Sequence, residues 1–243
     1  MKIEKYKHLG NGKYKVTIDN NDYIIYEDII LKYSFLGKDK ITKKDLDLCL
    51  KDNEFYEAYY KSISYIKTRL RSKVEIRKYL NKLYKAETVN SVINRLQKEG
   101  YLDENIYAEA YITDQINLKV SGPLKIENEL VKLGINKNVI DKHLVKFTKD
   151  QQYIKIRKVI EKEIRLNTNK SSIMLKNKIL KSLIDKGFYK EDILFCIDDY
   201  TFDDSNIYKT EYQKLYDKLS KKYSGNELEY RIKQKMYQKG FRT

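Results

Sequence analysis

The glycines that follow residue 50 constrain the fold more than any other feature of this sequence. Glycine suits the left-handed residue that ends many helices, because it has no Cβ to clash. Gly134, Gly187 and Gly240 close helical patterns in VKLGI, IDKGF and YQKGF, and Gly100 closes another in LQKEGYL. Such regular punctuation predicts a series of short, similar helical segments.

Alignment on Gly134, Gly187 and Gly240 indicates an internal repeat of about fifty residues. Matching apolar residues fall in register in the three copies: Ile126, Ile179 and Ile232, then Leu130, Leu183 and Met236. An earlier copy fits with Ile76 and Leu80, and has Tyr84 in place of the closing glycine. Each unit is expected to hold a leading helix, a short capped helix and a trailing helix, and Gly122 and Gly225 open two of the short helices.

The fold class expected is mainly α, because a single unit of this kind cannot bury its apolar face and must stack on its neighbours. We therefore predict tandem three-helix repeats in an elongated curved stack, with a small N-terminal β-hairpin module. The alternation of apolar and polar residues over 12–35, around the turn sequence DNND, predicts the hairpin, with a third short strand. The expected divisions are a hairpin module (1–40), a connecting helix (41–55), repeats at 56–102, 103–150 and 151–204, and a partial fourth repeat (205–243).

A helical pattern begins in ITKKDLDLCL, where Thr42 is the expected N-cap and Asp45 holds the capping-box position. Apolar residues then recur at spacings of three and four and predict one buried stripe. These residues are Phe55, Tyr59, Ile63, Ile66 and Leu70.

Charge is unevenly spread along the chain, whose formal net charge is +15. Residues 56–102 hold 11 Lys and Arg against 4 Glu, a net charge of +7. A basic section of this kind suggests a polyanion or an acidic protein groove as partner, although a solvated helix face is the alternative. The residues that we predict to bind a partner or DNA are Lys67, Arg69, Arg71, Lys73, Arg77, Lys78, Lys82 and Arg95.

Catalytic and cofactor motifs do not occur. The sequence has no glycine-rich phosphate loop, no HExxH and no CxxC, and its two cysteines and two histidines lack metal-ligand spacing. We therefore expect no enzyme activity, no cofactor, no metal and no disulfide, and a reducing cytoplasm as location. No apolar run approaches the roughly 18 residues that a membrane helix needs, so membrane insertion is not expected.

The stretch EGYLDENIYAEAY, residues 99–111, raises the question of an acidic catalytic cluster. Asp103 precedes a helical pattern, where a carboxylate favours the positive end of the helix, so we predict that it caps the helix and does not hold a metal. Tyr107, Ala108 and Tyr111 share one helix face, for which core packing is expected and a base-stacking platform is the alternative. The residues predicted to form the joints between repeats are Gly100, Asp103, Tyr107, Ala108, Tyr111, Gly122, Gly134, Gly187 and Gly240.

This joint resembles the signature of the RecX family of bacterial RecA regulators, in particular the longer members from low-GC Gram-positive bacteria. The family pattern has a helix-closing glycine, a Leu-Asp element, an aromatic-Ala pair and a glycine that leads into a further closing glycine. The matching residues are Gly100, Tyr101, Leu102, Asp103, Tyr107, Ala108, Tyr111, Gly122, Ile126, Glu129, Leu130 and Gly134. Glu104 and Leu133 depart from the pattern, and the segment YITDQINLKVSG has fewer arginines than is usual.

The resemblance implies a monomeric, non-enzymatic protein that binds the RecA filament on single-stranded DNA and inhibits its recombinase, ATPase and co-protease activities. Direct contact with single-stranded DNA would be weak and sensitive to salt. The residues alone leave a rival open, a helical-repeat DNA-binding protein or transcription regulator, because short helical units superficially resemble helix-turn-helix readers. Several similar units in tandem speak against one dedicated reader.

Overall fold

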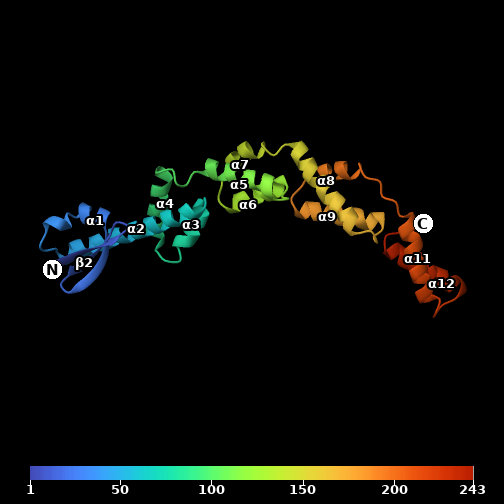
Figure 1. The fold of residues 1–243 in the computed structure, drawn as a ribbon, viewed down its shortest axis with the longest axis horizontal. Coiled ribbons are helices and arrows are strands. Elements are labelled where there is room, and N and C mark those ends of the chain that lie inside the picture. The colour runs from blue at the N-terminus through green and yellow to red at the C-terminus, as the bar shows by residue number, and fades with distance from the viewer. Residues whose placement is uncertain (243) are drawn as a thin grey trace. The chain divides into compact units, whose positions relative to one another are not determined.

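A computed structural model describes residues 1–242 and divides the chain into two compact units. Unit 1 comprises residues 1–107 together with 133–135, and unit 2 comprises residues 108–132 together with those from 136 onward. The described residues form twelve α-helices and one three-stranded sheet, joined by turns and one short 3₁₀ segment. Figure 1 shows their order along the chain. The predicted mainly α class with a small N-terminal β module is confirmed, while the curvature and elongation expected of the stack stay predictions.

The N-terminal sheet of unit 1 is antiparallel, with the order β1 (Ile3–Gly10), β2 (Lys13–Ile18), β3 (Asn21–Tyr26). The turn between β2 and β3 holds Asp19 and Asn20 at φ of 44° and 61°, as the DNND sequence predicted. One face of the sheet is apolar, and Val16, Ile18 and Ile25 are fully buried there. The sheet packs on a core that includes residues of α1, the turn after it and the start of α2, as expected for a hairpin that would be marginal alone in water.

The predicted hairpin extended to residue 35, and this part of the prediction is wrong. The sheet ends at Tyr26, and the chain continues as α1 (Glu27–Lys32) and a 3₁₀ turn η1 (Phe35–Gly37). Ile29 and Ile30 are both buried in the same core. A strand would send two successive side chains to opposite faces, whereas a helix can bury both against the sheet.

Helix α2 (Lys43–Thr68) is the longest helix in unit 1. Thr42 caps it as predicted, accepting a hydrogen bond from the backbone N–H of Asp45 at 3.1 Å. Because α2 is unbroken, the expected division between residues 55 and 56 lies inside a single helix. The apolar stripe packs into the core as predicted except for its last member: Leu70 lies beyond the end of the helix and is exposed.

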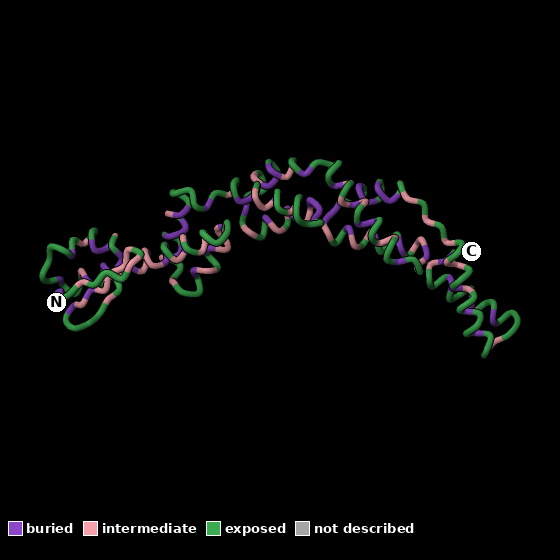
Figure 2. The backbone as a smooth tube through the Cα atoms, viewed as in Figure 1, coloured by how far each residue is buried: buried purple, intermediate pink, exposed green. Residues whose placement is uncertain are grey.

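Unit 1 is completed by α3 (Lys73–Leu80), α4 (Ala86–Lys98) and the start of α5 (Glu104–Leu118). Apolar residues of α2, α3 and α4 form a second core, distinct from that of the sheet. Buried positions recur at intervals along these helices (Figure 2). The spacing of the buried positions is that of amphipathic helices, each of which needs a neighbour to cover its apolar face.

Unit 2 contains the rest of α5 and seven further helices. Their bounds are α6 (Pro123–Lys132), α7 (Lys137–Leu144), α8 (Lys149–Leu166), α9 (Ser172–Asp185), α10 (Lys190–Ile197), α11 (Ser205–Leu219) and α12 (Gly225–Gln238). The isoleucines that the repeat aligned, Ile126, Ile179 and Ile232, are at most 1% exposed. Residues that the repeat places in register are therefore buried at equivalent positions of their helices.

The closing glycines meet the beginning of an earlier short helix. Within unit 2, the N–H of Gly122 donates to the carbonyl of Lys186 at 2.7 Å, and the N–H of Leu124 donates to the carbonyl of Gly187 at 3.1 Å. A Cβ on Gly122 would lie 2.3 Å from the carbonyl carbon of Gly187. The backbone at the start of α6 thus touches the backbone that follows α9. Any side chain at position 122 would prevent this close approach.

The same arrangement recurs at two other joints. In unit 1, a Cβ on Gly134 would lie 2.7 Å from Cγ2 of Val74 at the start of α3. In unit 2, the hydroxyl of Ser171, the N-cap of α9, donates to the carbonyl of Lys239 at 2.6 Å, next to Gly240. Gly134, Gly187 and Gly240 therefore each end their own helix and also receive the first residues of an earlier one.

Candidate partner-binding site

The eight basic residues predicted to bind a partner all lie in unit 1, between the end of α2 and the end of α4. They are not equivalent, because the structure gives some of them intramolecular partners and leaves others exposed. Four of the eight form ion pairs, one forms a hydrogen bond with an amide, and three have neither within residues 1–242.

Arg71 is part of the packing of unit 1. Only 10% of its side chain is exposed, and its guanidinium carbon lies 3.6 Å from the centroid of the Tyr65 ring. The Tyr65 ring also stacks on the ring of Tyr79, with a centroid distance of 4.5 Å. Arg71 also donates to the hydroxyl of Thr68 at 3.0 Å. A buried guanidinium in such a stack contributes mainly to stability.

Glu75 binds a second basic residue, Arg69, and also caps the start of α3. Its carboxylate accepts from Arg69 at 2.6 Å, from the backbone N–H of Ser72 at 2.9 Å and from the hydroxyl of Tyr107 at 3.0 Å. Burial opposes ionisation of Glu75, but these hydrogen bonds outweigh it, so its pKa lies below the ordinary value. Burial beside this carboxylate raises the pKa of Tyr107 to about 12. Arg69 is therefore held by an internal carboxylate.

Arg95 and Lys73 are also paired. Nε of Arg95 donates to Glu99 at 2.8 Å, and its guanidinium lies 4.5 Å from the ring centroid of Tyr59. The hydroxyl of Tyr59 donates to the same carboxylate at 2.5 Å, and hydrogen bonds from Tyr59 and Arg95 lower the pKa of Glu99. Nζ of Lys73 lies 3.9 Å from a carboxylate oxygen of Glu104.

The remaining basic residues are exposed. Lys67, Lys78 and Lys82 form no ion pair with any residue of the described range, and Arg77 makes one hydrogen bond of 3.4 Å to the amide oxygen of Asn90. These four residues can offer charge to a partner without breaking an internal ion pair. The predicted patch thus divides into four residues held in internal ion pairs and four exposed residues that form none.

The residues predicted to form joints lie where helices begin, end and pack. A carboxylate oxygen of Asp103 accepts from the backbone N–H groups of Asn105 at 2.7 Å and of Ile106 at 3.2 Å, which is the geometry of a helix cap. Gly100 has a φ of 78° after α4. Tyr107 and Ala108 are buried, and the hydroxyl of Tyr111 donates to Glu129 at 2.5 Å.

Adjacent acidic residues also occur at 191–192, 198–199 and 203–204, and one member of each pair has a structural partner. Asp192 pairs with Lys149 at 2.5 Å, Asp199 pairs with Arg157 at 2.8 Å, and Asp204 accepts from the backbone N–H of Ser172 at 2.7 Å. Within residues 1–242 no group of three or more His, Cys, Asp or Glu side chains is placed to hold a metal ion. Over the same range, no helix has both the length and the apolar character that crossing a membrane requires.

Sequence reasoning did not find a groove of about 500 Å³ in unit 1. It is lined by the β1–β2 turn, the start of β2, the end of β3, the C-terminal half of α2 and Tyr79 of α3. Its residues are separated by long stretches of sequence, and only the fold brings Asn11 and Tyr79 to one cavity. The only signal in the sequence is the density of tyrosine and lysine between residues 59 and 68.

Comparison with known proteins identifies relatives of the chain along almost its whole length. No family model matches the chain. Regulatory protein RecX of Bacillus cytotoxicus is 29% identical over 99% of this chain and 92% of its own length. Regulatory protein RecX of Halalkalibacterium halodurans is 27% identical over 96% of this chain and 91% of its own length. The resemblance to the RecX family is confirmed along almost the whole chain.

Solved structures agree with this RecX-like character. A crystal structure of regulatory protein RecX superposes on 81% of the chain and 98% of its own with a TM-score of 0.71, at 23% identity, which shows a shared fold. RecX from Lactobacillus salivarius covers 61% of the chain and 97% of its own, with a TM-score of 0.56 and 27% identity. The RecX-like chain is thus similar to proteins named as regulators, by sequence and by fold.

Proposed function

We propose that this RecX-like protein binds the RecA filament on single-stranded DNA and inhibits its recombinase, ATPase and co-protease activities. The observation that carries the proposal is similarity to proteins named regulatory protein RecX over nearly all of the chain. The protein would act by binding, as a monomer in the cytoplasm, without a cofactor.

The exposed half of the basic set supports a binding role. Lys67, Arg77, Lys78 and Lys82 are available to an acidic surface or to phosphates, whereas their paired neighbours stabilise unit 1. Repeated units could touch successive RecA subunits, and several weak contacts on one filament would add to a strong one. Asp103, Asp192, Asp199 and Asp204 support a non-catalytic role, because each binds the backbone at a helix start or forms an ion pair.

The test measures ATP hydrolysis by the cognate RecA on circular single-stranded DNA, with the protein added at substoichiometric ratios and at two salt concentrations. We expect the rate to fall, with a weaker effect at higher salt because charged contacts are screened. Electron microscopy would confirm that filaments were present at the start. An unchanged rate on confirmed filaments would refute the proposal.

A variant pair locates the contact. Lys78→Gln/Lys82→Gln removes two exposed charges of α3 and its following turn, and Lys5→Gln/Lys7→Gln removes two exposed charges of β1, where no contact is proposed. We expect the first variant to inhibit RecA less than the second. Equal inhibition by both variants would remove the α3 surface from the proposed site.

A further inference from the structure

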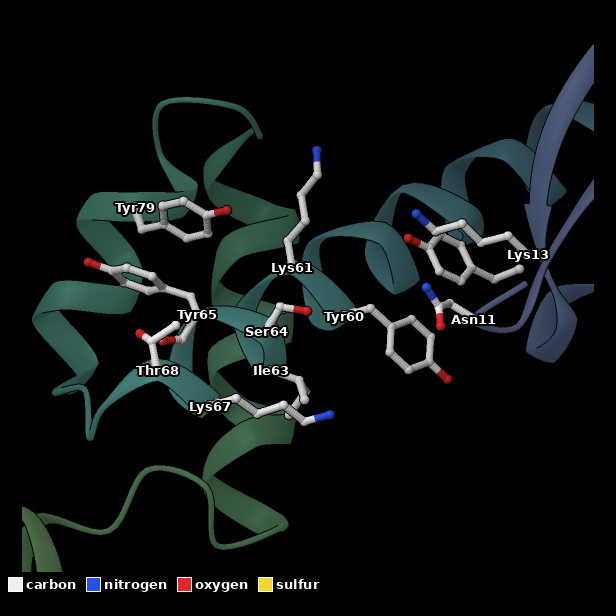
Figure 3. A pocket seen from close by; sticks show the side chains of 11 residues that line it. Asn11, Lys13, Tyr60, Lys61, Ile63, Ser64, Tyr65, Lys67, Thr68 and Tyr79 are labelled. Atoms are coloured by element: carbon white, nitrogen blue, oxygen red, sulfur yellow. The ribbon is translucent and has the colours of Figure 1, made fainter. Parts of the chain in front are cut away.

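The groove in unit 1 is lined by three lysines from two elements and by no carboxylate. Figure 3 shows Tyr60, Lys61, Ser64, Tyr65 and Lys67 projecting from α2, with Lys13 reaching in from the sheet. Lys61 pairs with Glu57 at 2.8 Å, but Lys13 and Lys67 form no ion pair with any residue of 1–242. The groove therefore carries positive charge that the described part of the chain does not neutralise.

Two stacked pairs of tyrosine rings flank these lysines. Tyr26 and Tyr60 stack at a centroid distance of 5.0 Å, and Tyr65 and Tyr79 stack at 4.5 Å. Tyr26 is buried, and Tyr65 already lies between Arg71 and Tyr79. Tyr60, which is 37% exposed, and Tyr79 are therefore the outer rings of the two pairs.

We propose that this groove binds single-stranded nucleic acid directly, with phosphates near Lys13 and Lys67 and bases against Tyr60 and Tyr79. A positively charged groove with aromatic rings on which bases can stack is the usual arrangement for binding a single strand without sequence preference. The hydroxyls of Ser64 and Thr68 and the amide of Asn11 add donors of the kind that contact phosphate oxygens.

Two other polyanions fit the groove less well. Duplex DNA hides the faces of its bases, so it could use the lysines but not the rings. An acidic peptide would likewise use the lysines and leave the stacked tyrosines without a role. The resemblance implied weak direct contact with single-stranded DNA, and the proposal gives that contact a site. It requires no RecA and concerns residues that the basic set, apart from Lys67, does not include.

The experiment measures fluorescence anisotropy of a fluorescein-labelled oligothymidylate with the full chain, without RecA, over a series of salt concentrations. Lys13→Gln/Lys67→Gln tests the charges, Tyr60→Leu tests the ring, and Lys5→Gln/Lys7→Gln is the control of equal charge change on β1. Circular dichroism melting would establish that each variant is folded.

The two kinds of variant should differ in their response to salt. Each lost phosphate contact should make the slope of log K against log salt less steep by about 0.7, so the Lys13/Lys67 variant should lose about 1.4. Tyr60→Leu should bind about tenfold more weakly with an unchanged slope, because it loses stacking and no charge. The Lys5/Lys7 control should bind like the unaltered chain.

A parallel titration uses labelled polyglutamate in place of the oligonucleotide. Three results would overturn the proposal: no binding of the oligonucleotide by the unaltered chain at low salt, equal weakening by the two lysine variants, or a Lys13/Lys67 variant that loses polyglutamate binding and keeps oligonucleotide binding. The last result would identify an acidic-peptide groove. Failure here leaves RecA ATPase inhibition as a separate measurement, so the two proposals can fail independently.

Discussion

The four short helices that the repeat aligned, α3, α6, α9 and α12, are alike in the middle of the series and different at its ends. Ser72, Ser121 and Ser171, which precede or cap the first three, are buried, whereas Ser224 before α12 is exposed. At the other end, the last three helices are followed by glycine, and α3 is followed by Tyr84, which lies under Lys61 of α2.

This difference indicates why serine and glycine recur at the same positions of the repeat. A buried serine is found where a later closing glycine packs on the start of the helix, and a closing glycine is found where an earlier helix start packs on it. The end of α3 receives no such helix start among the described residues and tolerates tyrosine. Glycine at these positions therefore serves contact between neighbouring repeats as well as helix termination.

The largest effect is expected for Gly187→Ala. Gly187 has a φ of 84°, and a Cβ there would lie 2.4 Å from the backbone nitrogen of Lys125. Strain and overpacking together should lower the free energy of unfolding by about 4 kcal/mol, measured by urea denaturation. The matched control is Gly100→Ala, with a φ of 78° and no atom within 4 Å of the new Cβ, which should cost only about 1 kcal/mol. Equal losses would mean that the joint contact does not matter.

The first joint differs from the others in carrying a full capping box between Ser72 and Glu75. Glu75→Gln should lower the free energy of unfolding by about 2 kcal/mol at neutral pH, because hydrogen bonds to the charged carboxylate are lost. The pKa of Glu75 is lowered in the folded chain, so its contribution is complete above its ordinary value of 4.5 and is lost as the pH falls below it.

Denaturation of both forms between pH 7 and pH 3 tests this sign. The difference in unfolding free energy between Glu75→Gln and the unaltered chain should shrink as the pH falls. A difference that stays constant or grows on acidification would show that ionised Glu75 does not stabilise the first joint.

Gly134→Ala should have a smaller effect than Gly187→Ala, because the obstacle is a side chain and not the backbone. The new Cβ would lie 2.7 Å from Cγ2 of Val74, at a φ of 78°. We expect a loss of about 2 kcal/mol in unfolding free energy. Combining it with Val74→Ala should restore part of this loss, and strict additivity of the two changes would contradict a direct contact.

The smallest changes in unfolding free energy are expected for the serines at the helix starts, where a buried serine should matter more than an exposed one. Ser171→Ala removes a cap and a hydrogen bond to the carbonyl of Lys239, and should cost about 1 kcal/mol. Ser224→Ala, at an exposed position without a side-chain cap, should stay within about 0.5 kcal/mol of the unaltered chain. Similar melting temperatures for the two variants would remove the distinction between interior and terminal joints.

Local chemistry was predictable from the sequence because it acts over a few residues. The glycine-closed helix ends, the caps at Thr42 and Asp103 and the burial of Ile126, Ile179 and Ile232 follow from rules about turns, helix termini and periodicity. The alternation that continued past Tyr26 misled the prediction, because burial of Ile29 and Ile30 against the sheet selects a helix there.

The sequence by itself determined the helical repeat, its register and the family resemblance, since these rest on spacing along the chain. Only the tertiary structure decided which charges are available: Arg71 and Lys67 are equally basic in sequence, but one is stacked on Tyr65 and the other is exposed. The groove between the sheet and α2 also exists only in the tertiary structure, because its lining residues come from distant parts of the sequence. Pairing and enclosure depend on residues far apart in the chain, and local patterns do not encode which of them meet.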